Sequence, residues 1–138
     1  MTRYLFDTDT CIHLINRARG YERLLARLDG MPRANTFISA VTVAELEYGA
    51  HKSARRNHNR RRLAHFLARF ELAAFDQAAA EEYGRVRAEL EDRGKPIGPL
   101  DTLIAAQALA LGAVLVSHNT REFARVPKLQ VRDWIADS

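Results

Sequence analysis

The stretch RYLFDTDTCIHLI, residues 3–15, sets a short apolar run, Tyr4–Phe6, directly before two acidic residues, Asp7 and Asp9. The run predicts a buried strand, and the residues after it take up helical spacing of apolar side chains. A strand leading into a helix is the first half of a βαβ unit, in which ligands bind at the carboxyl end of the strand. Two chemistries use such a pair of acids. Asp7 can be a nucleophile toward phosphate with Asp9 as its proton donor, or Asp7 can be a metal ligand.

The same alternation of strand and helix continues along the chain. Apolar runs predict strands at Tyr4–Phe6, Phe37–Ile38, Leu72–Phe75, Val114–Val116 and Leu129–Val131. Helical spacing predicts two short helices within Ile12–Leu28, a helical segment Val43–Phe70 broken near Asn57–Asn59, and helices at Gln77–Leu90 and Leu103–Leu111, the last capped by Gly112. We therefore expect an α/β fold, a three-layer α/β/α arrangement around a mainly parallel twisted sheet of about five strands.

Composition indicates one compact domain, residues 1–138, with an ordinary core. Apolar residues make up 47% of the chain and charged residues 28%, which excludes a disordered chain. Since no apolar run approaches the length of a membrane span or a signal peptide, neither is predicted. Cys11 is the only cysteine, so no internal disulfide forms, and we expect a small core residue in a cytoplasmic protein.

Positive charge is concentrated in one stretch. The formal net charge is +4, but His51–Phe70 holds seven Lys and Arg residues and no acid. Such a block suits contacts with phosphate and equally suits a solvated helix face. The candidate nucleic-acid contacts are Lys52, Arg55, Arg56, Arg60, Arg61 and Arg62. His51, His58 and His65 are seven residues apart, about 10 Å along a helix, which is too far to share a metal.

Three acids are candidates for a metal site, and two of them also fit structural roles. Glu45 follows Thr42 in a capping-box pattern, and Asp101 stands where an N-cap belongs. Asp7 has no basic neighbour in sequence to neutralise it. If the three meet at the sheet edge, carboxylates about 4 Å apart repel by about 4 kcal/mol at an effective dielectric near ~20, which favours a bound cation. Oxygen-only ligands favour Mg²⁺ or Mn²⁺ over zinc.

The alternative in which Asp7 is a phosphatase nucleophile lacks the acidic residues that would complete its metal site. YLFDTDTC resembles the first motif of haloacid-dehalogenase-like phosphatases, and TFIS ends in a strand-terminal serine like their second motif. Their last motif needs acidic residues after a late strand. Here that strand runs AVLVSHNTREF, with Asn119 and only Glu122 beyond it.

A second resemblance covers nearly the whole chain. YLFDTDTCIHLI, ISAVTVAELEYGAHKS, GKPIGPLDTLIAAQALALG and LVSHNTREFARVPKLQVRDW resemble, in order and spacing, the four blocks of PIN-domain ribonucleases, and more narrowly the VapC toxins of bacterial toxin–antitoxin pairs. The resemblance implies a metal-dependent endoribonuclease toxin and a toxin homodimer within a larger assembly. It also implies a cognate VapB-type antitoxin whose tail blocks the acidic pocket.

The resemblance also implies roles for individual residues. Asp7, Glu45 and Asp101 match the acids that hold Mg²⁺, and Asn119 or the neighbouring Glu122 matches the fourth position of the site. Asp9 stands where the family commonly has Asn. The matched positions around the pocket are Thr8, Ser39, Thr42 and Thr120, although a turn, a strand end and an N-cap explain such residues equally well.

The expected reaction is hydrolysis of a phosphodiester by metal-activated water. Because Asn119 is neutral, we expect one firmly held metal, with a second recruited only with substrate. The preferred substrate is a structured RNA loop, such as the anticodon region of a tRNA. Two alternatives stay open: a phosphatase acting on a small phosphomonoester, and a domain that binds RNA or a partner without catalysis.

Overall fold

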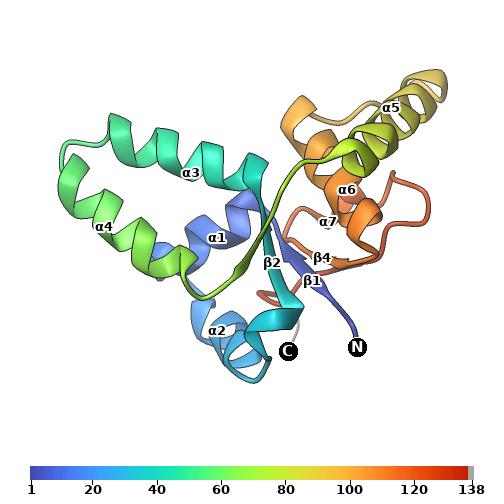
Figure 1. Ribbon diagram of the computed structural model, residues 1–138. Helices are drawn as coiled ribbons and strands as arrows, with labels where there is room; N and C mark the ends of the chain where they lie inside the picture. Colours follow the sequence, from blue (N-terminus) through green and yellow to red (C-terminus); the bar gives the residue numbers. More distant parts are fainter. Residues whose placement is uncertain (137–138) are drawn as a thin grey trace.

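The computed structural model describes residues 1–136 and contains a five-stranded, all-parallel sheet (Figure 1). Its strand order is β3-β2-β1-β4-β5. The strands are β1 (Tyr4–Phe6), β2 (Thr36–Ser39), β3 (Glu71–Ala73), β4 (Val114–Val116) and β5 (Val131–Arg132). The predicted α/β fold with a parallel sheet is confirmed. Because β1 is central and all strands are parallel, the residues that follow β1, β2 and β4 meet at one edge.

Helices cover both faces of the sheet, which gives the predicted three layers. They are α1 (Thr8–Ile15), α2 (Tyr21–Asp29), α3 (Ala40–Lys52), α4 (Arg56–Leu67), α5 (Gln77–Asp92), α6 (Pro99–Leu111) and α7 (Thr120–Phe123), with a 3₁₀ turn at Arg33–Asn35. One buried cluster joins α1–α4 to the sheet and a second joins α5–α7 to it. Leu5 and Phe6 show the strand alternation directly, since they are adjacent in β1 and belong to opposite clusters.

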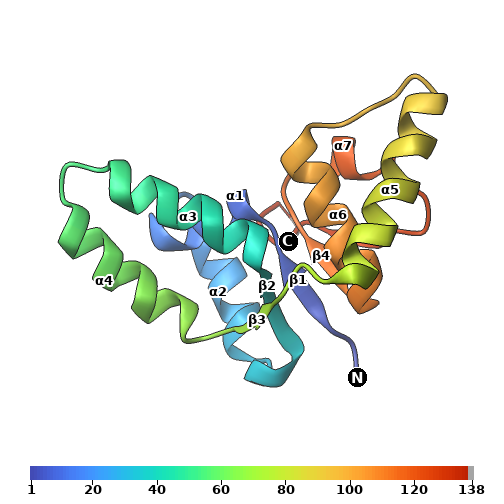
Figure 2. The ribbon, with the colours of Figure 1, turned by 45° about the horizontal axis from the view of Figure 1, so that its top comes forward.

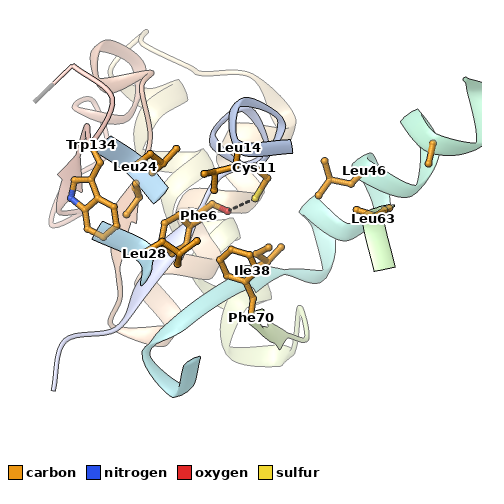
Figure 3. Close-up of a cluster of buried hydrophobic side chains, with 12 residues drawn as sticks. Phe6, Cys11, Leu14, Leu24, Leu28, Ile38, Leu46, Leu63, Phe70 and Trp134 are labelled. Atoms are coloured by element: carbon orange, nitrogen blue, oxygen red, sulfur yellow. Dashed lines mark hydrogen bonds between the residues drawn. The ribbon is translucent and has the colours of Figure 1, made fainter. Parts of the chain in front are cut away.

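The cluster under α1–α4 is organised around Phe6 (Figure 3). Its ring meets those of Phe70 and Trp134 edge-on, with centroids 5.4 and 5.6 Å away. Cys11 is fully buried beside it, and its thiol donates weakly to the Phe6 carbonyl at 3.9 Å. Burial raises the pKa of the Cys11 thiol, so the predicted role of Cys11 as a core residue is confirmed.

Several element boundaries differ from the predicted ones. α1 begins at Thr8 and α6 at Pro99, each earlier than predicted. The first turn of α1 is polar and gives no apolar signal, and α6 begins within a Gly- and Pro-rich stretch that is typical of a loop. The predicted break in this helical segment is confirmed, but it lies a few residues before Asn57–Asn59. The chain turns at residues 53–55, and Asn59 braces this turn from within α4 by donating to the Ser53 hydroxyl at 2.9 Å. α7 was not predicted, and β5 begins two residues later than expected.

Helices α3 and α4 form a pair that projects from one side of the sheet, as both views show (Figure 1 and Figure 2). The amino-terminal end of α3 lies at the sheet edge beside α1, and α4 returns toward the carboxyl end of α1. Among residues 1–136, no helix has both the length and the apolar character needed to cross a membrane.

Candidate active site

Asp7 ends β1 and is 3% exposed. Its Oδ1 accepts a hydrogen bond from the Thr10 amide at 2.9 Å, so Asp7 is the N-cap of α1. Burial raises the pKa of this carboxyl above its usual value, opposed by hydrogen bonds from Ser117 and Thr10. A capping role was an alternative for Glu45 and Asp101, yet of these three acids it is Asp7 that caps a helix.

Asp101 lies in the first turn of α6, where Gly98 is the N-cap and Pro99 the first helical residue. The alternative explanation of Asp101 as an N-cap is therefore wrong. Its pKa is raised to about 6, first by burial and then by the charge of Glu122, that of Asp7, and a hydrogen bond with Glu122. The charge of Asp7 acts on Asp101 across the sheet edge. The structure thus brings together two acids that are 94 residues apart in the sequence.

Asn119 and Glu122 both lie against Asp101. The Asn119 Nδ2 donates to Glu122 Oε2 at 2.6 Å and, more weakly, to Asp101 Oδ2 at 3.5 Å. The first of these bonds is the main reason that the pKa of Glu122 is lowered, and a hydrogen bond from the Gly98 amide adds to it. Asn119 is therefore a donor that holds two carboxylates, while Glu122 supplies the negative charge.

Glu45 is linked to the site by a hydrogen bond with Thr8, the residue that follows Asp7. The Thr8 hydroxyl donates to Glu45 Oε1 at 3.0 Å and shares a 3.1 Å hydrogen bond with the Thr42 hydroxyl. The capping-box interpretation of Thr42 and Glu45 is wrong, because α3 begins at Ala40 and its N-cap is Ser39. Glu45 is thereby free of a capping role and is oriented by the residue that follows Asp7.

The remaining polar candidates have different positions. Ser39 is fully buried and its hydroxyl donates to Gln107 Oε1 at 2.9 Å, so it fixes α6 to β2. Asp9 is exposed, and its charge still raises the pKa of both Asp7 and Asp101. Thr120 is exposed at the start of α7, and within the described residues its hydroxyl makes no hydrogen bond to the acids.

Two residues that support the site were not assigned a role in it from the sequence. Ser117 hydrogen-bonds Asp7 and also accepts the Asn119 amide at 2.9 Å, so it joins the two sides of the acidic cluster. Gln107 is 1% exposed and donates to the Ala74 carbonyl at 3.3 Å as well as accepting from Ser39. A lone amide inside the otherwise apolar run LIAAQALAL was the available signal for Gln107.

The chemistry of the acidic cluster fits a hard cation. The charges that contribute most at Asp101 are all carboxylates, from Glu122, Asp7 and Asp9. Oxygen donors of this kind suit Mg²⁺ or Mn²⁺. In residues 1–136, however, no three Asp, Glu, His or Cys side chains already surround a single point closely enough to hold an ion. The cluster thus has the right donors, but they are not arranged as a finished metal cage.

The basic candidates lie on the projecting pair of helices, α3 and α4, away from Asp101 and Glu122. Lys52 ends α3, Arg55 precedes α4, and Arg56, Arg60, Arg61 and Arg62 belong to α4; all six are exposed. Arg69, the seventh cation of the block, instead donates to the carbonyls of Leu28 and Met31 and is a structural residue. His51 lies on α3, so the three histidines do not share one helix.

The chain matches the family model of the PIN domain over residues 4–129. The chain belongs to the PIN-domain family. This PIN-domain chain is 38% identical to the tRNA(fMet)-specific endonuclease VapC of Shigella flexneri over 97% of its own length and 99% of the relative's. It is also 38% identical to Ribonuclease VapC2 of Rickettsia felis, over 95% and 97% of the two chains. Its sequence therefore places it among the VapC ribonucleases of the PIN-domain family.

Solved structures of similar sequence and fold lead to the same family assignment. The DNA-bound VapBC of Salmonella typhimurium superposes with a TM-score of 0.90 and 38% identity, covering 97% of this chain and 99% of that one. FitAcB of Neisseria gonorrhoeae superposes with a TM-score of 0.83 and 28% identity, covering 95% and 97%. The resemblance drawn from the four sequence blocks is confirmed at the level of family and fold.

Proposed function

We propose that this VapC-type PIN domain is a metal-dependent endoribonuclease and the toxin of a toxin–antitoxin pair. The observation that carries the proposal is the meeting of Asp7, Asp101 and Glu122 at the carboxyl edge of the sheet. Such a set of mutually repelling carboxylates is costly to the fold, and a cation would relieve the repulsion. The nearly full-length similarity to ribonucleases supports RNA cleavage as the reaction that a cation here would assist.

Asp7, Glu45, Asp101 and Glu122 are the side chains that would hold Mg²⁺ or Mn²⁺. When bound, such an ion polarises the scissile phosphate and activates water. The residues of the chain orient these groups beforehand. The N-cap bond fixes Asp7, Thr8 fixes Glu45, and Asn119 holds Glu122 and Asp101. The oxygen of a water molecule would attack phosphorus while a carboxylate takes its proton, and the P–O bond to the leaving nucleotide would break as the departing oxygen takes up a proton from solvent.

We infer that the substrate is an unpaired loop of a structured RNA, with the anticodon loop of a tRNA as the first candidate. The support is the name of two relatives, tRNA(fMet)-specific endonuclease, at 38% and 37% identity. Proteins read RNA sequence mainly in single-stranded loops, whose bases are accessible. The exposed cations of α4 supply contacts to the RNA backbone.

The proposed partner is a cognate VapB-type antitoxin. The similar structures from Salmonella typhimurium and Rickettsia felis are VapBC complexes with DNA. By that similarity, we propose a toxin homodimer within a larger toxin–antitoxin assembly. An antitoxin that covers the acidic edge would keep RNA from reaching Asp7 and Asp101.

One assay tests the function against its alternatives. The protein, freed of antitoxin, is incubated with total RNA and Mg²⁺, and the new RNA ends are mapped. We expect cuts confined to specific loops, which disappear on addition of EDTA. Hydrolysis of para-nitrophenyl phosphate with intact RNA would instead favour a phosphatase. RNA binding without any cut would favour a non-catalytic domain.

A further inference from the structure

A hollow of about 480 Å³ lies between the carboxyl end of α1 and one face of α4. Leu14 and Phe66 give it an apolar floor, and the side chains around them are almost all cationic or imidazole. Neither the acidic cluster nor the overall fold accounts for this concentration of charge. We call it the basic pocket, and its polar members are Arg17, His58, Arg61, Arg62 and His65.

The positive charge of the basic pocket is not neutralised. Within residues 1–136, no carboxylate forms an ion pair with Arg17, Arg61 or Arg62, and Arg62 donates only to the Ile15 carbonyl, at 2.9 Å. The pKa of His58 is lowered, chiefly by the charge of Arg55 and further by Arg62 and Arg61. Uncompensated cations around a concave surface favour an anionic ligand.

The arginines of α5 show the contrasting arrangement. Arg85 pairs with Glu82 at 2.6 Å and Glu89 at 3.6 Å, and Arg87 pairs with Glu91 at 2.9 Å. These pairs are neighbours one helical turn apart, as on most solvated helix faces. α4 has no acid with which to form such pairs. A helix that merely faced solvent would be expected to look like α5.

The backbone at Arg17 gives a second, independent indication. Arg17 has φ +49°, the left-handed conformation, and it follows the C-cap Asn16 of α1. Its amide donates to the Leu14 carbonyl, and the Ala18 amide donates to His13, which together form a Schellman motif. Glycine is the residue that this position favours. An arginine kept there against the backbone preference indicates a use for its side chain.

The basic pocket adjoins a groove that reaches the acidic site. This groove, of about 270 Å³ between α1, α3 and α4, is lined by residues that include Glu45 and Arg62. Ile15 and Arg62 line both hollows, so the two are adjacent. α1 begins directly after Asp7 and its eight residues span about 12 Å. That length matches a few stacked nucleotides at about 3.4 Å each.

We propose that the basic pocket binds a backbone phosphate of the RNA substrate, a few nucleotides from the bond that is cleaved. The inference rests on the proposed ribonuclease function and assigns a substrate contact to that same reaction. RNA fits better than an acidic peptide because the positive surface does not end at the pocket. Arg55, Arg56 and Arg60 are exposed outside the pocket, and Arg56 and Arg60 lie on the other side of α4, so a long polyanionic chain finds further cations around the helix.

Two variants test the proposal, with a matched control. Arg17→Gly and Arg61→Gln each remove one cation from the pocket, while Arg87→Gln removes one from an ion pair on α5. Glycine is favoured at position 17 because the backbone there is left-handed, so Arg17→Gly should not destabilise the fold. If the Tm of this variant equals or exceeds that of the wild type, weaker RNA binding is not due to unfolding. The probe is a fluorescein-labelled tRNA(fMet) transcript, with its affinity measured by anisotropy in EDTA over a range of salt concentrations.

We expect each pocket variant to flatten the slope of log K against log salt by about 0.7 and to weaken binding about fivefold near ~0.1 M salt. Arg87→Gln should leave both unchanged. If wild type and both pocket variants share one slope while wild type still cleaves RNA, the pocket assignment is overturned and the ribonuclease proposal stands. If wild type neither binds nor cleaves RNA, both are overturned. Loss of antitoxin binding with unchanged RNA binding would show that the pocket serves the protein partner, which also overturns the assignment.

Discussion

Removal of the Asp101 charge should stabilise the fold while it abolishes the activity. The pKa of Asp101 is raised from 3.8 to about 6, a difference of about two units, or about 3 kcal/mol at 1.36 kcal/mol per unit. Because the side chain is partly exposed, solvent screening reduces this to about 1–2 kcal/mol. Asp101→Asn should therefore raise the free energy of unfolding at pH 7 by that amount, which is an increase in Tm of several degrees.

The sign of the pH dependence follows from linkage. The folded state holds the Asp101 proton more tightly than the unfolded state, so between pH 3.8 and about 6 wild-type stability falls as this proton is lost. Asn carries no titratable proton. The stability difference between variant and wild type should therefore be absent below pH 3.8, grow up to about pH 6 and stay constant above it.

Thermal unfolding followed by circular dichroism across this pH range, without divalent cations, measures the difference. Glu81→Gln is the control, since Glu81 is exposed on α5 and accepts a hydrogen bond from Gln77. A variant that is no more stable than wild type at pH 7, or whose advantage does not change with pH, would show that the acids do not crowd Asp101.

Three further changes test other parts of the structure. Asp7→Asn keeps the N-cap of α1, because Asn caps as well as Asp, and should keep the fold while it ends RNA cleavage; retained cleavage, measured on a gel, would contradict the site. Gln107→Leu removes the acceptor of the Ser39 hydroxyl proton and the donor to the Ala74 carbonyl and should cost about 1–3 kcal/mol in urea unfolding, whereas the exposed Gln130→Leu should cost little. Neutral residues at 60–62 should lower the salt dependence of RNA binding by up to about two units of slope; an unchanged slope would make this part of α4 a solvated face.

The sequence was sufficient to predict the fold because apolar runs mark buried strands directly. β1 and β4 were predicted at their observed bounds, Tyr4–Phe6 and Val114–Val116. Helix starts were predicted less well, since a first turn that faces solvent carries no apolar signal. The start of α6 was predicted at Leu103 and not at Pro99 for another reason, because its first turn lies in a Gly- and Pro-rich stretch that is typical of a loop.

The same limitation explains the errors in the candidate site. A capping role depends on where a helix begins, so Asp101 was misread once the start of α6 was misplaced. The grouping of Asp7 with Asp101 was predictable, because parallel strands bring their carboxyl ends to one edge. The contacts of Ser117 with Asp7 and of Gln107 with Ser39 were not, because each links segments that are distant in sequence.

Metal binding itself provides the remaining test, measured by calorimetric titration of Mn²⁺ into the antitoxin-free protein near pH 6. We expect one tight site in the wild type, with protons released as the ion displaces them from Asp101, and loss of that site in the Asp7→Asn, Asp101→Asn double variant. Equal binding by both proteins, or no binding by either, would contradict a cation shared by the acids at the edge of the sheet.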